Sequence, residues 1–287
     1  MNGARIKYIS SMLIFGSVGL LVRLLPLTSA QIALGRGSIG CLFLVGAFFL
    51  LRKRLSFEHI RADLIVLIIS GISIGINWIL LFQSYRYTTI ATATICYYLA
   101  PVIVVLLSPL VLGETLNRLK IVCIITTLVG FVLITGWGGP GSNDLLGILY
   151  GVGAAFFYAV IILANKFLRH VTNMERTIIQ LGISTIALLP YVLSTTGTAT
   201  NLSLKSFGLL LIVGIVHTGL AYYLYFSGLN GLSGQTAALF SYFDPLTAIL
   251  FSALFLSEPL VAAQIIGGVL ILGSTLVNDL LSPKKTT

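Results

Sequence analysis

Apolar residues fill long stretches of the chain, and short polar, basic or glycine-rich breaks separate these stretches. Most are about 20 residues long, which is the length that a helix needs to cross a bilayer. The pattern therefore predicts an all-α integral membrane protein with ten transmembrane helices. We expect them near residues 6–22, 31–51, 62–84, 91–112, 119–136, 145–164, 175–195, 206–228, 235–256 and 262–281.

An internal repeat links the two halves of the chain. Residues 91–114 return 144 positions later as residues 235–258, and nine of 24 positions across 98–121 are identical at that offset. The matches include Pro101 and Pro245, and each removes a backbone donor from its helix and predicts a kink. A matched pair of proline-interrupted apolar segments points to the binding site of a transporter.

The repeat divides the chain into two five-helix units, expected over residues 1–138 and 144–287, with a glycine-rich linker between them. Because five is an odd number, the second unit enters the membrane from the opposite side. The predicted fold is therefore two inverted five-helix repeats.

Composition and charge support this topology. The chain is 57% hydrophobic and 9% charged, whereas soluble domains carry about 25% charged residues. With the N-terminus inside, thirteen Lys and Arg lie on the cytoplasmic side and three outside, as the positive-inside rule requires. The net charge of +9 is then a topology signal, and nucleic acid is not an expected partner. Both termini are expected in the cytoplasm, with the protein in the cell membrane.

The residues Tyr97–Leu116, YYLAPVIVVLLSPLVLGETL, and their echo Ser241–Leu260, SYFDPLTAILFSALFLSEPL, resemble the drug/metabolite transporter superfamily in its ten-span EamA-type branch. The shared motif is an aromatic residue, a proline and a glutamate thirteen residues after it, and the resemblance covers nearly the whole chain. It implies that spans 1–4 and 6–9 surround a central cavity, with spans 5 and 10 at the periphery. Family members export amino acids, other metabolites or drugs, and some import nucleobases, vitamins or sugar phosphates.

Two charged residues within predicted spans are candidates for substrate binding. Asp244 precedes Pro245 near mid-membrane, where an Asp costs about 2.5–3.5 kcal/mol on insertion scales. It is interpreted as a proton-coupling group or a counter-charge for a substrate amine, or else as a structural hydrogen-bonding group at the kink. Arg36 could bind a substrate carboxylate as a fork of donors, pair with Asp244, or extend towards the outer surface.

Polar residues share one helical face of span 3, because Ser70, Ser73, Asn77 and Ser84 are spaced at helical intervals. This face is expected to meet protein or water. His217 aligns with Ser73 at the repeat offset, and is either a satisfied hydrogen-bonding group or a proton-coupling group.

Aromatic residues gather near the predicted kinks, where they could line a cavity or serve ordinary packing. Glu114 and Glu258 are expected to cap helices, and the pairs Gly71–Gly75 and Gly147–Gly151 to allow close helix packing. The three cysteines have no metal-ligand spacing, so neither a metal nor a cofactor is expected. The candidate substrate-binding residues are Arg36, Asn77, Trp78, Tyr97, Tyr98, Tyr158, His217, Tyr222, Tyr242 and Asp244.

These features predict a secondary transporter that exports an amino acid or a related small metabolite by alternating access. Its expected partners are this solute, the lipid bilayer and protons as a candidate coupling ion, for a monomer or homodimer. No Walker motif is present, which excludes direct ATP coupling within this chain. The alternatives are a membrane receptor or scaffold, and an intramembrane serine protease built on residues 231–234. The protease interpretation is disfavoured because all three histidines precede that segment.

Overall fold

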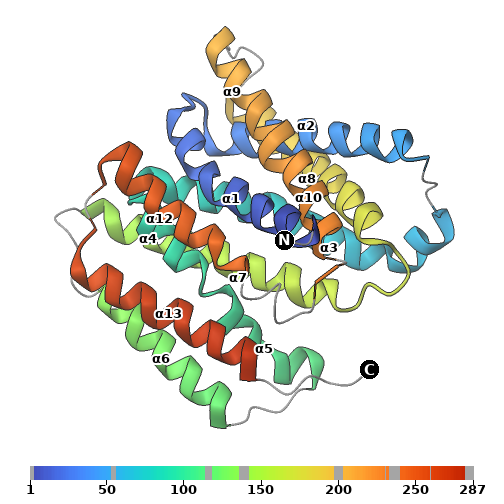
Figure 1. Cartoon of the computed structure of the whole chain (residues 1–287). Coiled ribbons are helices and arrows are strands. Elements are labelled where there is room, and N and C mark those ends of the chain that lie inside the picture. The colour runs from blue at the N-terminus through green and yellow to red at the C-terminus, as the bar shows by residue number, and fades with distance from the viewer. Residues whose placement is uncertain are drawn as a thin grey trace.

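The computed structural model describes residues 3–52, 56–113, 118–135, 142–196, 203–229, 231–232, 240–258 and 260–281. Within these ranges the chain forms helices joined by short connections and contains no strand (Figure 1). The helices are α1 (Gly3–Leu24), α2 (Ser29–Leu50), α3 (Phe57–Tyr87), α4 (Ile90–Tyr97), α5 (Ala100–Leu112), α6 (Arg118–Thr135), α7 (Ser142–Asn165), α8 (Asn173–Thr196), α9 (Leu204–Gly214), the π-helical turn η1 (Ile215–Leu220), α10 (Ala221–Leu229), α12 (Phe243–Leu256) and α13 (Ala262–Leu281).

The chain is a multi-pass membrane protein. Seven helical segments are long and apolar enough to cross a membrane: α1, α2, α3, α4 with α5, α7, α8, and α9 with α10. The predicted spans at 119–136, 235–256 and 262–281 fall on α6, α12 and α13, of which α12 and α13 hold shorter apolar segments.

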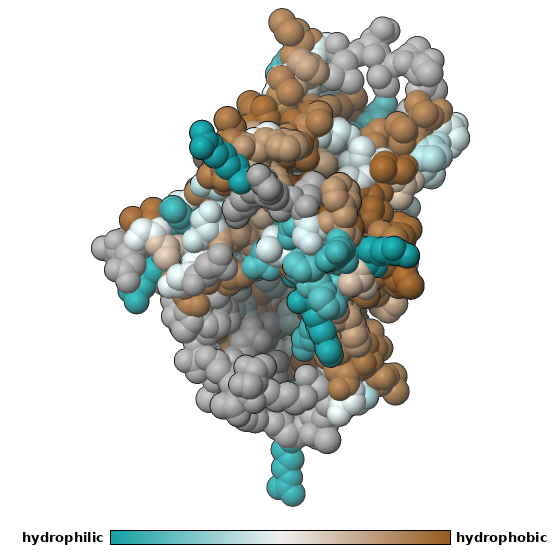
Figure 2. Space-filling model, turned by 90° about the vertical axis from the view of Figure 1, so that its right-hand side faces the viewer, coloured by the Kyte–Doolittle hydropathy of each residue, from teal (hydrophilic) through white to brown (hydrophobic). Residues whose placement is uncertain are grey.

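Large apolar side chains cover the outside of the helix bundle. Leu110 is 85% exposed and its repeat partner Leu254 is 72% exposed. Hydrophobic side chains also cover the upper part and the right-hand edge of the face in Figure 2. Such a surface suits contact with lipid chains, whereas in water it would be a large exposed apolar patch.

The two matched prolines stand at helix starts. Pro101 is the second residue of α5, after a break at Tyr98 and Leu99, and Pro245 is the third residue of α12. A missing N–H costs little in the first turn of a helix, where no intrahelical acceptor is available. The predicted kink at Pro101 is therefore a break between two helices, and Pro245 marks the beginning of a new one.

Local geometry repeats at the 144-residue offset. Gly113 ends α5 with φ of 64°, and Ser257 ends α12 with φ of 53°, so both adopt the left-handed conformation common at helix C-termini. The N–H of Gly113 donates to the carbonyl of Ser108, and that of Ser257 donates to the carbonyl of Ser252. Both ends of the repeat thus terminate their helices in the same way.

Helices from the two halves pack on each other. The helix α1 packs on α10 and α12, α7 packs on α3, α4 and α5, α2 packs on α9 and η1, and α8 packs on α3. The helices α6 and α13 lie side by side at one edge of the molecule (Figure 1).

Glycines allow the closest of these approaches. A Cβ at Gly71 would lie 2.8 Å from the side chain of Ile183 in α8, and one at Gly147 would lie 2.7 Å from Thr88. A Cβ at Gly75 or at Gly151 would likewise lie 3.0 Å from the nearest atom of a neighbouring helix. The predicted role of both glycine pairs in helix packing is confirmed.

Candidate substrate-binding cavity

A cavity of about 410 Å³ lies between helices of the two halves. Its walls come from α1, α2, α3, α4, α5, α7, α8, α10 and α12. Nine of the ten predicted substrate-binding residues line it, and Pro101 lines it as well; the nine are Arg36, Asn77, Trp78, Tyr97, Tyr98, Tyr158, Tyr222, Tyr242 and Asp244. His217 and Pro245 are not among the lining residues. The contribution of each residue to binding stays a prediction.

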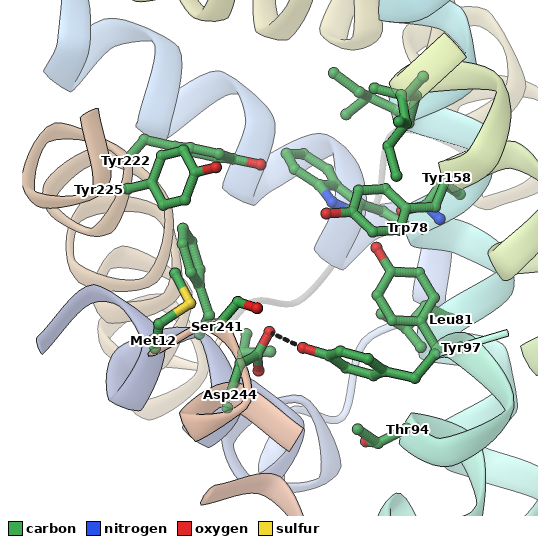
Figure 3. Close-up of a pocket in the computed structure, with 18 of the residues that line it drawn as sticks. Met12, Trp78, Leu81, Thr94, Tyr97, Tyr158, Tyr222, Tyr225, Ser241 and Asp244 are labelled. Carbon is green, nitrogen blue, oxygen red and sulfur yellow. Dashed lines mark hydrogen bonds between the residues drawn. The ribbon is translucent and has the colours of Figure 1, made fainter. Parts of the chain in front are cut away.

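The carboxyl group of Asp244 enters the cavity from the first turn of α12. One of its oxygens, Oδ2, accepts a hydrogen bond of 3.0 Å from the hydroxyl of Tyr98, drawn as the dashed line in Figure 3. The start of a helix carries free N–H groups and a positive dipole end, which favour a carboxylate at this place. The Tyr98 hydroxyl therefore positions the Asp244 carboxyl group close to the start of a helix.

The guanidinium of Arg36 is held by neutral groups. The side chain is 4% exposed, so it does not extend towards the outer surface. Its Nε donates to Thr218 Oγ1 at 3.0 Å and its Nη2 to the carbonyl of His217 at 3.3 Å. The guanidinium carbon also lies 4.2 Å from the centre of the Trp78 ring, a cation–π distance.

Arg36 and Asp244 line one cavity without neutralising each other. No ion pair joins them in the part of the chain that the structure describes. The pairing of Arg36 with Asp244 that the sequence left open is therefore not formed. The cavity offers a separate cationic group and a separate carboxyl group to a solute.

The contacts of Arg36 depend on the π-helical turn η1. A π turn directs hydrogen bonds to residues five positions back, and such turns are frequent at functional sites. Thr218 Oγ1 donates to the carbonyl of Val213 at 3.1 Å, and His217 Nδ1 lies 3.4 Å from the carbonyl of Ile212. The other ring nitrogen of His217 lies 3.0 Å from Ser17 Oγ in α1. His217 is thus a buried, hydrogen-bonded residue between helices.

Aromatic rings form two facing walls of the cavity. Tyr97 and Tyr158 stack with centroids 5.0 Å apart, and Tyr222 stacks on Phe226 at 6.1 Å. In Figure 3, Tyr222 and Tyr225 lie on one side of the cavity, and Tyr97 and Tyr158 lie on the other. Such surfaces suit the apolar part of a metabolite or a cation.

The polar face of span 3 mainly joins helices. Asn77 Nδ2 donates to the carbonyl of Ala154 at 2.6 Å, and Ser84 Oγ donates to the carbonyl of Gly147 at 2.7 Å, both in α7. Ser70 accepts a bond of 2.6 Å from Gln180 in α8. The expectation that this face meets protein is correct, and of its four residues only Asn77 also lines the cavity.

Several lining residues were missing from the sequence-based candidates, among them Tyr8, Thr94, Asn165, Arg176 and Gln180. Gln180 is the repeat partner of Arg36, so the offset offered a signal for it. Arg176 resembles an ordinary cytoplasmic basic residue in the sequence, and no sequence signal separates it from the others.

Glu258 connects helices at the end of the bundle that the topology predicts to be outside. Its Oε1 pairs with Arg23 Nη2 in α1 at 3.0 Å, and its Oε2 accepts from the N–H of Ile90 at 2.9 Å. Glu258 therefore caps a helix, as expected, but this helix is α4 in the other half. It is not the next helix along the chain. Glu114 lies outside the described residues, and so do Ser233 and Gly234 of the protease alternative.

The helix α12 is attached to α4 at two places. Asp244, at the start of α12, bonds to Tyr98, which follows the last residue of α4. Glu258, just after α12, caps the first residue of α4. Two carboxyl groups from one repeat thus hold both ends of one short helix in the other repeat.

No group of three His, Cys, Asp or Glu side chains with metal-binding geometry occurs within the described ranges. At the opposite end of the bundle, acidic side chains bind backbone groups. Asp63 accepts from the N–H of His170 at 2.9 Å, and Glu175 accepts from the N–H groups of Ser56 and Thr172 at 3.1 and 2.9 Å. These carboxylates fasten connections between helices.

Comparison with known proteins decides the family. A family model described as "EamA-like transporter family" matches residues 6–136 and 145–278, one match in each half of the chain. The chain belongs to the EamA-like transporter family. The predicted relationship to the drug/metabolite transporter superfamily is thereby confirmed, and this EamA-like protein is a membrane transporter.

Individual relatives agree with this assignment. The "Uncharacterized transporter YxxF" of Bacillus subtilis (strain 168) is 31% identical over 255 residues, which are 88% of this chain and 81% of that protein. Protein PecM of Dickeya dadantii (strain 3937) is 25% identical, over 73% of this chain and 71% of its own. A solved crystal structure with 18% identity matches 97% of this chain and 96% of its own at a TM-score of 0.65, and so shares the fold.

Proposed function

We propose that this EamA-like transporter exports a small zwitterionic metabolite, an amino acid or a related compound, by alternating access. One observation supports this proposal above the others: Arg36 and Asp244 line the same cavity and do not pair with each other. A substrate carboxylate would accept from the free N–H groups of Arg36, and a substrate amine would bind the carboxyl group of Asp244. The aromatic walls would hold the rest of the molecule.

The proposed architecture is ten spans in two inverted five-helix repeats. The packing supports it, because contacts between the halves have counterparts at the 144-residue offset: α1 with α10 corresponds to α7 with α3, and α1 with α12 corresponds to α7 with α5. The equivalent left-handed helix ends at Gly113 and Ser257 support it as well. Both termini would then lie in the cytoplasm.

In this topology the cavity faces the cytoplasm. Several lining residues, such as Tyr8, Asn165 and Arg176, lie near the helix ends assigned to that side. At the other end, the ion pair between Arg23 and Glu258 fastens α1 to the connection after α12. Alternating access would break this contact and open the cavity outwards, with loading from the cytoplasm first.

Asp244 is the candidate proton carrier. An ionisable carboxyl group at membrane depth that faces a cavity is a common element of proton relays. A proton and a substrate amine would compete for the same group. Proton entry would then favour substrate release, as exchange requires.

Transport in proteoliposomes tests the proposal. Vesicles that hold the purified protein are preloaded with one unlabelled amino acid at a time, and uptake of the same labelled amino acid is followed with and without a pH gradient. We expect counterflow of at least one amino acid, with strong losses in Arg36→Gln and Asp244→Asn. Arg169→Gln is the matched control, because Arg169 is exposed and does not line the cavity. Transport that prefers plain amines or plain carboxylates, or that both variants leave intact, would contradict the proposal.

A further inference from the structure

A second arginine faces the cavity near its cytoplasmic end. Arg176 lies in the first turn of α8, and its guanidinium carbon is 5.8 Å from the centre of the Phe226 ring in α10. Within the described chain its side chain forms no ion pair. The neighbouring carboxylate of Glu175 is occupied by the backbone N–H groups of Ser56 and Thr172. Arg176 therefore adds a cation to the cavity without a carboxylate to neutralise it.

Arg36 in α2 and Arg176 in α8 contact the same helical segment, η1 followed by α10. Arg36 bonds to Thr218, and Arg176 lies over Phe226, eight residues later, which corresponds to about 12 Å along a helix. Between them Tyr222 stacks on Phe226 and lines the cavity. The two guanidinium groups therefore contact this segment at separate places, an arrangement that suits a solute with two acidic groups.

Charge balance gives the substrate class. A zwitterion with one carboxylate would neutralise Arg36 and Asp244 and leave Arg176 uncompensated. Arg176 is partly buried in the cavity wall, and a partly buried charge without a partner favours ligands that supply the opposite charge. A solute with two acidic groups and one amine would match all three protein groups.

We propose that Arg36 and Arg176 bind the two acidic groups of the substrate, so that the cavity selects dicarboxylic amino acids over neutral ones. This inference rests on the proposed function and specifies its substrate. Arg176 would bind the second acidic group at the cytoplasmic mouth, and Arg36 the first.

Fluorescence of Trp78 provides a direct binding assay. The chain has two tryptophans, Trp78 and Trp137, so Trp137→Phe leaves Trp78, beside Arg36, as the sole reporter. The probes are L-glutamate and L-glutamine, which have nearly the same shape and differ by one acidic group. We expect L-glutamate to bind about tenfold or more tightly than L-glutamine, the difference typical of one charged hydrogen bond.

Variants assign the preference to Arg176. We expect Arg176→Gln to weaken L-glutamate binding about tenfold and to change L-glutamine binding less than about twofold. Arg36→Gln should weaken both, whereas Arg169→Gln, which removes an exposed cytoplasmic charge, should change neither. Arg176→Lys keeps the charge and should retain part of the preference, which separates a binding role from a folding defect.

Two patterns of affinity would overturn the inference, and so would the absence of any binding signal. In the first, the unmodified chain binds L-glutamine and L-glutamate with equal affinity. In the second, Arg176→Gln folds normally but loses affinity for both probes equally, while Arg176→Lys binds both normally. Either result would leave transport of zwitterions intact, provided that L-glutamine still binds through Arg36 and Asp244. If neither probe changes the fluorescence of Trp78, the inference is wrong, whatever solute the vesicles transport.

Discussion

The hydrogen bond between Tyr98 and Asp244 positions the carboxyl group at the wall of the cavity. A substrate amine and a proton would both bind at this group. The affinity for an amine should therefore fall as the pH is lowered, because protonation removes the negative charge that attracts the amine.

Asp244→Asn tests this competition. Asparagine keeps the shape of the side chain but carries no charge and takes up no proton in the pH range of the experiment. We expect the affinity for an amine-bearing substrate to fall about tenfold or more, in the range of a charged hydrogen bond. We also expect the remaining transport to lose its variation with pH. Substrate affinity and initial rates measured between about pH 5 and 8 check both effects, and an unchanged pH profile would rule Asp244 out as the competing group.

For single residues, the sequence identifies unusual charged side chains better than it predicts the contacts that they make. Asp244 and Arg36 stand out because charged residues inside apolar spans are rare and expensive. Arg176 does not stand out, because a basic residue at a cytoplasmic helix end satisfies the positive-inside rule without any further role. The contacts of His217 were also unpredictable, because they depend on the register of the π turn.

The π turn η1 supplies the hydrogen-bond acceptors of Arg36. Its widened register presents Thr218 Oγ1 and the carbonyl of His217 to one guanidinium. Although Ile215–Leu220 contains His217 and Thr218, these residues do not predict a π turn from the sequence. This turn packs against α2, which contributes Arg36.

Thr218→Val tests the role of this turn in positioning Arg36. Valine has the shape of threonine but cannot accept from Arg36 Nε, so a buried charged donor loses its acceptor, at a cost of about 1–3 kcal/mol. We expect the affinity for a carboxylate-bearing substrate to fall about three- to tenfold and the Trp78 emission to shift. Thr218→Ser keeps the hydroxyl and is the matched control. Equal affinities and spectra in the two variants would contradict this role.

Glycine packing sets how closely the helices approach. We expect Gly147→Ala to lower stability by about 1–3 kcal/mol, because its Cβ would lie 2.7 Å from Thr88 Cβ and 2.9 Å from the Thr88 nitrogen. Gly208→Ala is the control, since nothing lies within 4 Å of its Cβ position. It should leave stability unchanged or raise it by up to about 1 kcal/mol through helix propensity. Thermal unfolding in one detergent compares the two, and a Gly147→Ala protein as stable as Gly208→Ala would show that α7 can move away from Thr88.

For the whole molecule, the sequence predicted an all-helical membrane protein with two similar halves, because hydropathy, length and the 144-residue offset are properties of the chain itself. The breaks before Pro101 and Pro245 follow from the same repeat. The partner of Glu258 did not follow from it, because it depends on which helices meet across the two halves. Span positions were therefore predictable, whereas contacts between repeats were not.

The orientation of the whole molecule can be tested with two cysteines. In a background without Cys41, Cys96 and Cys123, Ser142→Cys lies beside the linker between the halves and Ser282→Cys near the C-terminus. An impermeant maleimide added to intact cells should label the first and reach the second only after permeabilisation. Labelling of Ser282→Cys in intact cells, or none of Ser142→Cys before permeabilisation, would contradict the inverted topology.

The double attachment of α12 to α4 has a consequence for how cargo and conformation communicate. The attachment of Asp244 to Tyr98 uses the group that a substrate amine would need, and in the proposed mechanism the attachment of Glu258 to Ile90 would help to close the outer end of the bundle. A bound amine would draw Asp244 away from Tyr98, and α4 would then be fastened to α12 by its outer end alone. Without substrate, α4 would be attached to α12 at both of its ends. With substrate bound, only one attachment would remain, so that binding itself would loosen the contact between the two halves of the protein.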